Sequence, residues 1–567
     1  MSSVDINSSS IPLGSHTLDI YSIDRVGNTS NAIRMNIIKP EVFNVKDYGA
    51  KGDGTTDDTQ AVRNTIEAAN SYLQSSDRGF AVIYFPTGIY LIKQLKIHSN
   101  MFLIGDGINS TKLIRFVDRS QGSLYNSGTF TTNTNPPPES AGDSSWFKSF
   151  ISNYNFRGNR SDPINHYTNY NIGIMKMTIN GNGYSFNLDN DENRGNMLVK
   201  FKNSKNITID NVRLEDSMNW HLDLRGSKYI SIGYIEIEGN TQRDNGRIND
   251  RNNQDGINMH GVHDATIDRA IVYESYDDSL FIGADIVGPS NEPALWVPQP
   301  AFNITVNYLE VYRQVGTGSA LALASEYLEG CDVYNVHIKY VKLHNLGQRG
   351  MIVLQYPNYQ ETPIGEGKGI IHDIQIDKIE SYGYSIGNVW GNPESLLKIT
   401  TRPQSLYDNK YNNRKFYNIY IKDIYADFQQ PQYDGSSTTT NKQSGIVLEN
   451  VRNVIIDNVT LINKNNQRHA ISFVMSSDIT INNAYIRNNQ SGGWALMNMK
   501  DTQNVIINNT TIPYISGTIK QGGAALRVEG KTRDITVYYR ELRTNSEISF
   551  INVPNYYQNT IRLVQIR

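Results

Sequence analysis

The distribution of apolar and polar residues divides the chain into a short N-terminal segment and a long repetitive body. In the first segment, apolar and polar positions alternate over residues 15–37 on both sides of a turn at Gly27 and Asn28. This period of two predicts a β-hairpin. Residues 1–40 are therefore either a β-extension packed on the main body or the remnant of an Ig-like module, and the pattern favours neither.

Residues 57–74 have the clearest helical pattern in the chain. Asp57 or Asp58 is suited to cap the first turn. The apolar stripe consists of Ala61, Ile66, Ala69 and Leu73. Residues 81–92 (AVIYFPTGIYLI) then predict two strands separated by a turn at Pro86-Thr87-Gly88.

The rest of the body repeats one unit: a short β-branched strand, an Asn, Asp or Gly turn, and a second short strand. The shortest spacing between units is about 25 residues, a period typical of stacked repeats. The units lie at 205–216, 228–239, 263–274, 302–313, 331–345, 371–381, 416–427, 451–463, 476–488 and 502–512. A β-propeller needs about 40 residues per repeat, and the Leu-x-x-Leu-x-Leu pattern of leucine-rich repeats is absent. We therefore predict an all-β fold, a right-handed parallel β-helix over 41–567, with the helix capping its open N-terminal end.

Composition supports this architecture and excludes other classes. The chain has 567 residues, 65 of them asparagines, which suit turns that require left-handed backbone and can stack into side-chain ladders. Charges nearly balance, at 53 basic against 56 acidic residues, which argues against a nucleic-acid partner. No run of 18 apolar residues predicts a membrane span, and Met1 opens no apolar signal segment. A single cysteine, Cys331, excludes a disulfide framework.

One segment carries a specific resemblance. Residues 45–69 (VKDYGAKGDGTTDDTQAVRNTIEAA), followed by VIYFPTGIYLI and MFLIGDG, resemble the first coil of the pectate-lyase-like β-helix superfamily. The resemblance implies the fold and leaves the chemistry open, because lyases, hydrolases, epimerases and phage tailspikes share it.

Three aspartates form the strongest candidate for catalysis. Asp255 precedes the pair Asp277 and Asp278 by a distance close to one coil of the repeat. We therefore expect three carboxylates on one face, where crowding raises at least one pKa. A protonated acid beside ionised carboxylates is what glycosidic bond cleavage requires. Solvated turn aspartates are the alternative explanation.

The flanking sequence, NNQDG and YDDS, resembles the Asn-Thr-Asp-Gly and Gly-Asp-Asp elements of inverting β-helical glycoside hydrolases, the polygalacturonase, dextranase and α-1,3-glucanase group. The resemblance implies that Asp277 is the general acid and that Asp255 and Asp278 hold and activate the water, with inversion and without a covalent intermediate. It also implies a site that uses no catalytic cofactor or metal.

The same resemblance points to residues that bind substrate. Trp220 and His221, one coil earlier, would face the cleft; a core aromatic and a structural histidine are the alternatives. His260 lies near Asp255. Thr317 stands where polygalacturonases have the histidine of Gly-His-Gly. Their later Arg-Ile-Lys pair has no counterpart near 349–356, so we expect a neutral glucan, α-1,3-glucan first and dextran next, rather than galacturonate.

Further expectations complete the prediction. The hydrolase should be secreted and monomeric. The loop aromatics Trp146, Trp296, Trp390, Tyr327 and Tyr356 could line a sugar-binding groove, with burial under long loops as the alternative. The acidic loop 187–193 could hold structural calcium, with an ordinary solvated loop as the alternative. A phage tailspike or surface adhesin is the second hypothesis, and would form a trimer. A polysaccharide lyase is the third; it needs a basic residue among the acids, and only Arg269 lies between Asp255 and Asp278.

Overall fold

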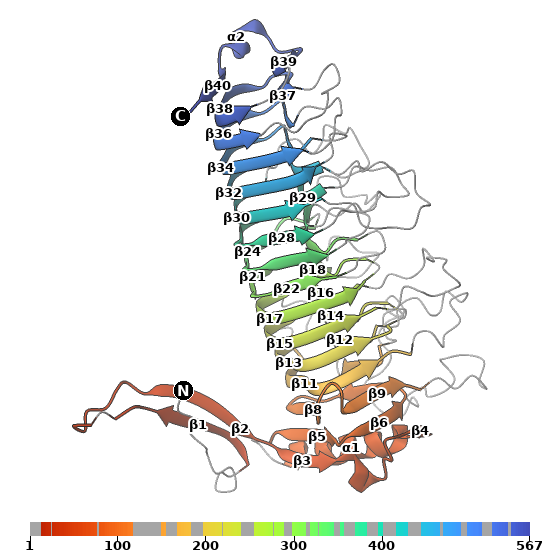
Figure 1. The fold of residues 1–567 in the computed structure, drawn as a ribbon. Helices are drawn as coiled ribbons and strands as arrows, with labels where there is room; N and C mark the ends of the chain where they lie inside the picture. The colour runs from red at the N-terminus through yellow and green to blue at the C-terminus, as the bar shows by residue number, and fades with distance from the viewer. Residues whose placement is uncertain are drawn as a thin grey trace.

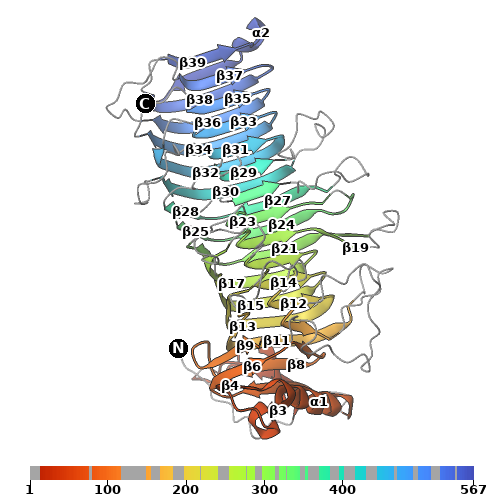
Figure 2. The same cartoon turned by 90° about the vertical axis from the view of Figure 1, so that its right-hand side faces the viewer.

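The computed structural model shows a single elongated solenoid of parallel strands stacked coil upon coil (Figures 1 and 2). The fold is a right-handed parallel β-helix, as predicted. The structure describes residues 13–567 except 24, 76–78, 117–148, 155–166, 183–196, 218, 240–254, 276, 288–296, 313–317, 327, 345–351, 356–368, 383–394, 401–415, 429–443, 465–468, 489–495, 513–523 and 543–545.

One face of the solenoid is a parallel sheet that we call the long sheet. Within the described residues it has fourteen strands, and every strand except the two at the ends pairs with the strand one coil earlier and the strand one coil later. They are β7 (Leu95–Ile97), β10 (Ile151–Asn153), β12 (Val199–Lys202), β14 (Leu222–Arg225), β16 (Ile257–His260), β18 (Leu280–Gly283), β23 (Leu321–Ala324), β26 (Ile352–Gln355), β29 (Ser395–Thr400), β31 (Ser444–Glu449), β33 (Ile471–Val474), β35 (Met497–Lys500), β37 (Ala524–Glu529) and β39 (Ser546–Ile551).

The remaining solenoid strands cover the other faces and form what we call the bent sheet. Its first strands are β3 (Glu41–Asn44), β4 (Asp53–Asp57), β5 (Ala81–Phe85), β6 (Gly88–Ile92), β8 (Met101–Gly105) and β9 (Thr111–Arg115). Then follow β11 (Asn169–Asn180), β13 (Ser204–Glu215), β15 (Lys228–Glu238), β17 (His263–Glu274), β21 (Ala301–Val306), β22 (Leu309–Val311), β24 (Val333–Ile338), β25 (Val341–His344), β27 (Ile371–Ile376), β28 (Ile379–Tyr382), β30 (Phe416–Asp427), β32 (Val451–Lys464), β34 (Ser477–Asn488), β36 (Gln503–Ile512), β38 (Arg533–Leu542) and β40 (Ile561–Gln565).

Inward-facing aliphatic side chains form one continuous core along the axis. On β16, Ile257 and Met259 are fully buried, and Ile257 pairs in register with Leu280 of β18. Because side chains alternate along a strand, the residues between them point outward from the long sheet. This alternation determines which polar side chains reach the candidate site.

The predicted capping helix is present as α1 (Thr59–Ser75) at the N-terminal end of the solenoid. It begins two residues later than the pattern indicated, because both aspartates make contacts ahead of it. Asp57 Oδ1 accepts the N–H of Thr59 at 3.0 Å, whereas the Asp58 carboxylate accepts two backbone N–H groups, of Lys51 and Gly52. A short helix, η2 (Val45–Tyr48), precedes it, and α2 (Asn555–Gln558) lies near the C-terminal end.

The expected hairpin is formed by β1 (Gly14–Ile20) and β2 (Ile33–Lys39), which pair antiparallel. It extends sideways from the first coils (Figure 1). Its origin in an Ig-like module stays a prediction. In the part of the chain that the structure describes, no helix has the length and apolarity to cross a membrane.

Asparagine ladders run along the turns, as the composition indicated. Asn483 has φ 56°, donates to Asn458 Oδ1 at 2.8 Å and accepts from Asn509 Nδ2 at 2.8 Å. Asn458 in turn donates to Asp423 Oδ1 at 2.7 Å. Each rung therefore satisfies the side chain of the rung before it.

Substitutions at Asn483 should separate the two roles of a ladder residue. Asn483→Ala loses both side-chain hydrogen bonds and puts a Cβ at positive φ, so we expect a loss of about 2–4 kcal/mol in unfolding free energy. Asn483→Gly loses only the hydrogen bonds and should cost about half as much. Urea unfolding followed by circular dichroism measures both. Equal losses would contradict the role of the left-handed turn.

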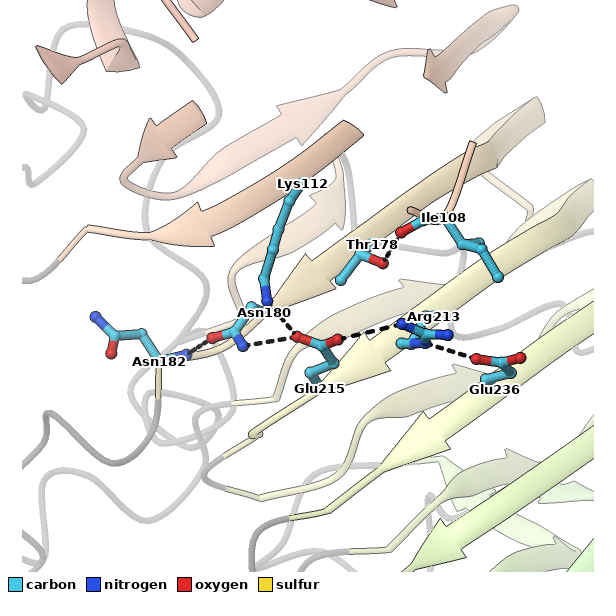
Figure 3. A network of polar contacts seen from close by, with 8 residues as sticks. All are labelled: Ile108, Lys112, Thr178, Asn180, Asn182, Arg213, Glu215 and Glu236. Atoms are coloured by element: carbon cyan, nitrogen blue, oxygen red, sulfur yellow. Dashed lines mark hydrogen bonds and ion pairs between the residues drawn. The ribbon is translucent and has the colours of Figure 1, made fainter. Parts of the chain in front are cut away.

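Charged side chains on the outside of the bent sheet connect the coils that precede the candidate site (Figure 3). Glu215 accepts from Lys112 at 2.7 Å and from Asn180 at 2.9 Å, and Arg213 Nε lies 2.5 Å from Glu236 Oε2. Opposite charges on neighbouring strands stabilise the pairing. This network fixes the ends of β13 and β15, where the chain turns back toward the long sheet.

Candidate active site

The three predicted aspartates lie at the beginning of two adjacent strands of the long sheet. Asp255 precedes β16, and Asp277 and Asp278 precede β18. The N–H of Gly256 donates to Asp278 O at 2.9 Å, which places Asp255 one coil from Asp278 in register. Asp277 is the adjacent residue in the chain. The one-coil spacing therefore brings three carboxyl groups to one place.

Asp255 has the most perturbed environment of the three. It is 5% exposed, and its pKa is raised well above the usual range, first by burial and then by the charges of Asp277 and Asp278. Asn258 Nδ2 donates to Asp255 Oδ2 at 2.7 Å and opposes the shift. Asp278 Oδ1 accepts the N–H of Ser319 at 2.6 Å, a contact suited to an ionised carboxylate. The cluster thus combines a buried carboxyl, Asp255, whose raised pKa favours its protonated form, with Asp278, whose carboxylate accepts a backbone hydrogen bond.

Gly318 allows the chain to pass close to Asp277. A Cβ at this position would lie 2.1 Å from the carbonyl carbon of Asp277 and 2.5 Å from its Oδ1. Any side chain would displace Asp277, so the glycine after Thr317 has a structural reason. Thr317 itself lies outside the described residues.

Two of the residues predicted to bind substrate border the aspartates. His221 is fully buried, and its Nδ1 lies 2.8 Å from the backbone oxygen of Asp255, which it holds in position. Trp220 is half-buried; its ring stacks on His260 at 5.4 Å, and Arg225 lies 5.8 Å from its centroid. Burial lowers the pKa of His260 to about 4, so this imidazole is neutral at pH 7.

The structure adds four charged side chains that the sequence analysis did not single out. Lys200 Nζ lies 3.2 Å from Asp223 Oδ2, and Arg225 Nη1 lies 3.6 Å from Asp285 Oδ2. Burial lowers the pKa of Lys200 to about 8. The signal for Lys200, Asp223 and Arg225 in the sequence was the alternation in VKFK and LDLR, where each polar residue follows an inward-facing one.

His263 and Arg269 are close to the aspartates in sequence but lie on the bent sheet. His263, on β17, stacks on Phe302 of β21, and Arg269, also on β17, lies over the ring of Tyr308. Neither is part of the candidate site. Arg269 is therefore not placed to act as the base of a lyase among these acids.

The other predicted features fall outside the described residues. These are the five loop aromatics Trp146, Trp296, Trp390, Tyr327 and Tyr356, and the acidic loop 187–193. Among the residues that the structure does describe, no group of three His, Cys, Asp or Glu side chains is arranged to hold a metal ion.

Two family models match the sequence. Residues 42–174 match the family described as rhamnogalacturonase A/epimerase, pectate lyase-like, and residues 365–538 match the right-handed β-helix region. The first match includes the segment 45–69, and the second covers the later repeats. Both matches support a relationship of this chain to the pectate-lyase-like right-handed β-helix superfamily.

Individual relatives match over short segments. Alginate lyase 7 of Azotobacter vinelandii is 39% identical over 84 residues, 13% of this chain and 9% of the relative. Plasmin and fibronectin-binding protein A of Streptococcus pneumoniae is 30% identical over 218 residues, 36% of this chain and 25% of the relative. A solved exopolygalacturonase from Thermotoga maritima has a TM-score of 0.48 at 15% identity, covering 83% of this chain and 93% of its own. Among the curated relatives matched by sequence, this chain spans 9% of the length of alginate lyase 7 and 25% of the length of plasmin and fibronectin-binding protein A.

Proposed function

We propose that the protein is an inverting glycoside hydrolase that cleaves a neutral polysaccharide at the Asp255, Asp277 and Asp278 cluster. The observation that carries the proposal is the convergence of three carboxyl groups on adjacent coils, with Asp255 buried and its pKa raised. Such a set supplies both the acid and the base of a single displacement. We also propose that the protein acts outside the cell as a monomer.

In the proposed reaction, Asp277 donates its proton to the glycosidic oxygen as the bond to the anomeric carbon breaks. A water held by Asp255 and Asp278 attacks that carbon from the opposite face, and Asp278 accepts the proton that the water loses. Three adjacent carboxylates retain a proton near neutral pH because their charges repel. In the free protein the proton is held preferentially by Asp255, because its pKa is raised. The reaction therefore requires that this proton pass from Asp255 to Asp277 when substrate is bound.

The charge balance of the site supports a neutral substrate. Two cations on the strands that precede β16, Lys200 and Arg225, each have a carboxylate partner, Asp223 and Asp285 respectively. These four groups therefore carry no net positive charge that could bind the carboxylate of a uronate. We therefore propose α-1,3-glucan as the first substrate to test and dextran as the second.

A second candidate is binding to a surface polymer without turnover. It is favoured by the 218-residue match to plasmin and fibronectin-binding protein A, the longer of the two matches to curated relatives described above. Under this alternative the three aspartates bind ligand and perform no chemistry, and the protein forms a trimer.

A substrate panel tests these proposals. The protein is incubated with α-1,3-glucan, dextran, polygalacturonate and alginate, while reducing ends and ultraviolet absorbance are followed. We expect reducing ends from a neutral glucan and no absorbing product. An unsaturated uronate would establish a lyase instead, and binding without any new reducing ends would favour the adhesin candidate.

A further inference from the structure

A row of polar side chains continues the aspartate cluster toward the N-terminal coils. On the outer face of the long sheet, Lys200 pairs in register with Asp223, and Asp223 with Asn258. Asn258 then donates to Asp255 at 2.7 Å. Because neighbouring coils are about 4.8 Å apart, the row covers roughly two coils beside the reacting groups.

The unsatisfied atoms in this row are all acceptors. Asp223 is 0% exposed and Asn258 is 1% exposed. Within the described part of the chain, Asp223 Oδ1, Asn258 Oδ1 and Asp255 Oδ1 are buried and accept no hydrogen bond. Leaving a buried polar atom without a partner is costly, so several in one place indicate a ligand that supplies donors. Sugar hydroxyls donate, whereas a uronate carboxylate only accepts.

The charges around the row point to the same kind of ligand. Asp223 is ion-paired with Lys200, and Arg225 lies between Asp223 Oδ1, at 4.0 Å, and Asp285 Oδ2, at 3.6 Å. The charges of these four groups sum to zero, and the neighbouring His260 is neutral at pH 7. Lys202, which pairs in register with Arg225, is a further cation outside this set. A charged sugar finds no unmatched partner among the four.

From these contacts we infer that Asp223 and Asn258 bind hydroxyl groups of an uncharged sugar ring, in a subsite adjoining the three aspartates. This rests on the proposed function, because the ring is the next unit of the polysaccharide whose bond is cleaved. Asp223 is a binding residue in this subsite, and Lys200 holds its carboxylate in position.

The test measures binding separately from cleavage. In the Asp277→Asn background, isothermal calorimetry compares α-1,3-linked gluco-oligosaccharides, isomalto-oligosaccharides and oligogalacturonates of increasing length. Adding Asp223→Asn should weaken binding of the neutral oligosaccharide at least about tenfold, the loss of a charge-assisted hydrogen bond. A further variant, Lys200→Gln with Asp223→Asn, removes both charges and keeps the buried pair neutral. Asp268→Asn, on the bent sheet, is the matched control.

Each outcome decides the inference. Weaker binding in both Asp223 variants, with the control unchanged, supports it even if the wild-type protein cleaves nothing; in that case only the hydrolase proposal fails. Unchanged affinity in the folded double variant overturns it. It is also overturned if no neutral oligosaccharide binds, or if oligogalacturonates bind instead.

Discussion

Replacing Asp277 with asparagine should lower kcat on the responsive glucan by about a thousandfold, with little change in KM. The amide cannot donate a carboxyl proton to the leaving oxygen, and loss of a general acid typically costs 10²- to 10⁴-fold. The isosteric side chain preserves the close approach of Gly318 to Asp277. Reducing-end assays under saturating substrate measure the effect.

The matched control is Asp268→Asn on β17. Asp268 accepts from Asn307 Nδ2 at 2.6 Å on the bent sheet, so its loss tests for a general effect of removing a carboxylate. It should keep full activity. An Asp277→Asn variant that retains more than about a tenth of the wild-type kcat would remove Asp277 from the role of acid. Proton NMR of the first product should show the inverted anomer.

Much of the architecture follows from local sequence because each coil repeats the same physical requirement. Turns that need left-handed backbone select asparagine, and β-branched residues alternate toward one core, so the repeats predicted the solenoid. The spacing between Asp255 and Asp278 predicted that they lie close together for the same reason. Residues separated by one coil of sequence are one strand apart along the solenoid axis.

The residues that surround the aspartates were less predictable. Asp223 and Asn258, which pair in register, are separated by more sequence than the shortest coil contains, because the segment 240–254 intervenes, so spacing alone did not place them side by side. The role of His221 at the cleft stays a prediction; the structure places its Nδ1 2.8 Å from the backbone oxygen of Asp255, a contact that the spacing did not indicate. Such contacts depend on the path of the intervening turn, which no periodic pattern encodes.

The stability of the protein should rise when Asp255 is replaced with asparagine, although activity is lost. Burial and two neighbouring carboxylates raise the pKa of Asp255, so the folded state favours its protonated form. Above the unfolded pKa of about 3.9, folding must therefore take up a proton, and stability falls as pH rises toward the folded pKa. An amide carries no such cost. We expect Asp255→Asn to unfold at higher urea than wild type at pH 7 and at nearly the same urea at pH 4.

Asp53 provides a control of opposite sign. Backbone N–H groups of Thr56 and Thr55 lower its pKa, so its ionised form is favoured in the folded state. Asp53→Asn should therefore destabilise the protein at pH 7, and the difference should disappear as pH falls. If Asp255→Asn is instead less stable than wild type at pH 7, the buried carboxyl is structural, and its role in holding water fails with it. If Asp255→Asn is more stable than the wild type and inactive, the protein retains Asp255 for catalysis despite its cost in stability.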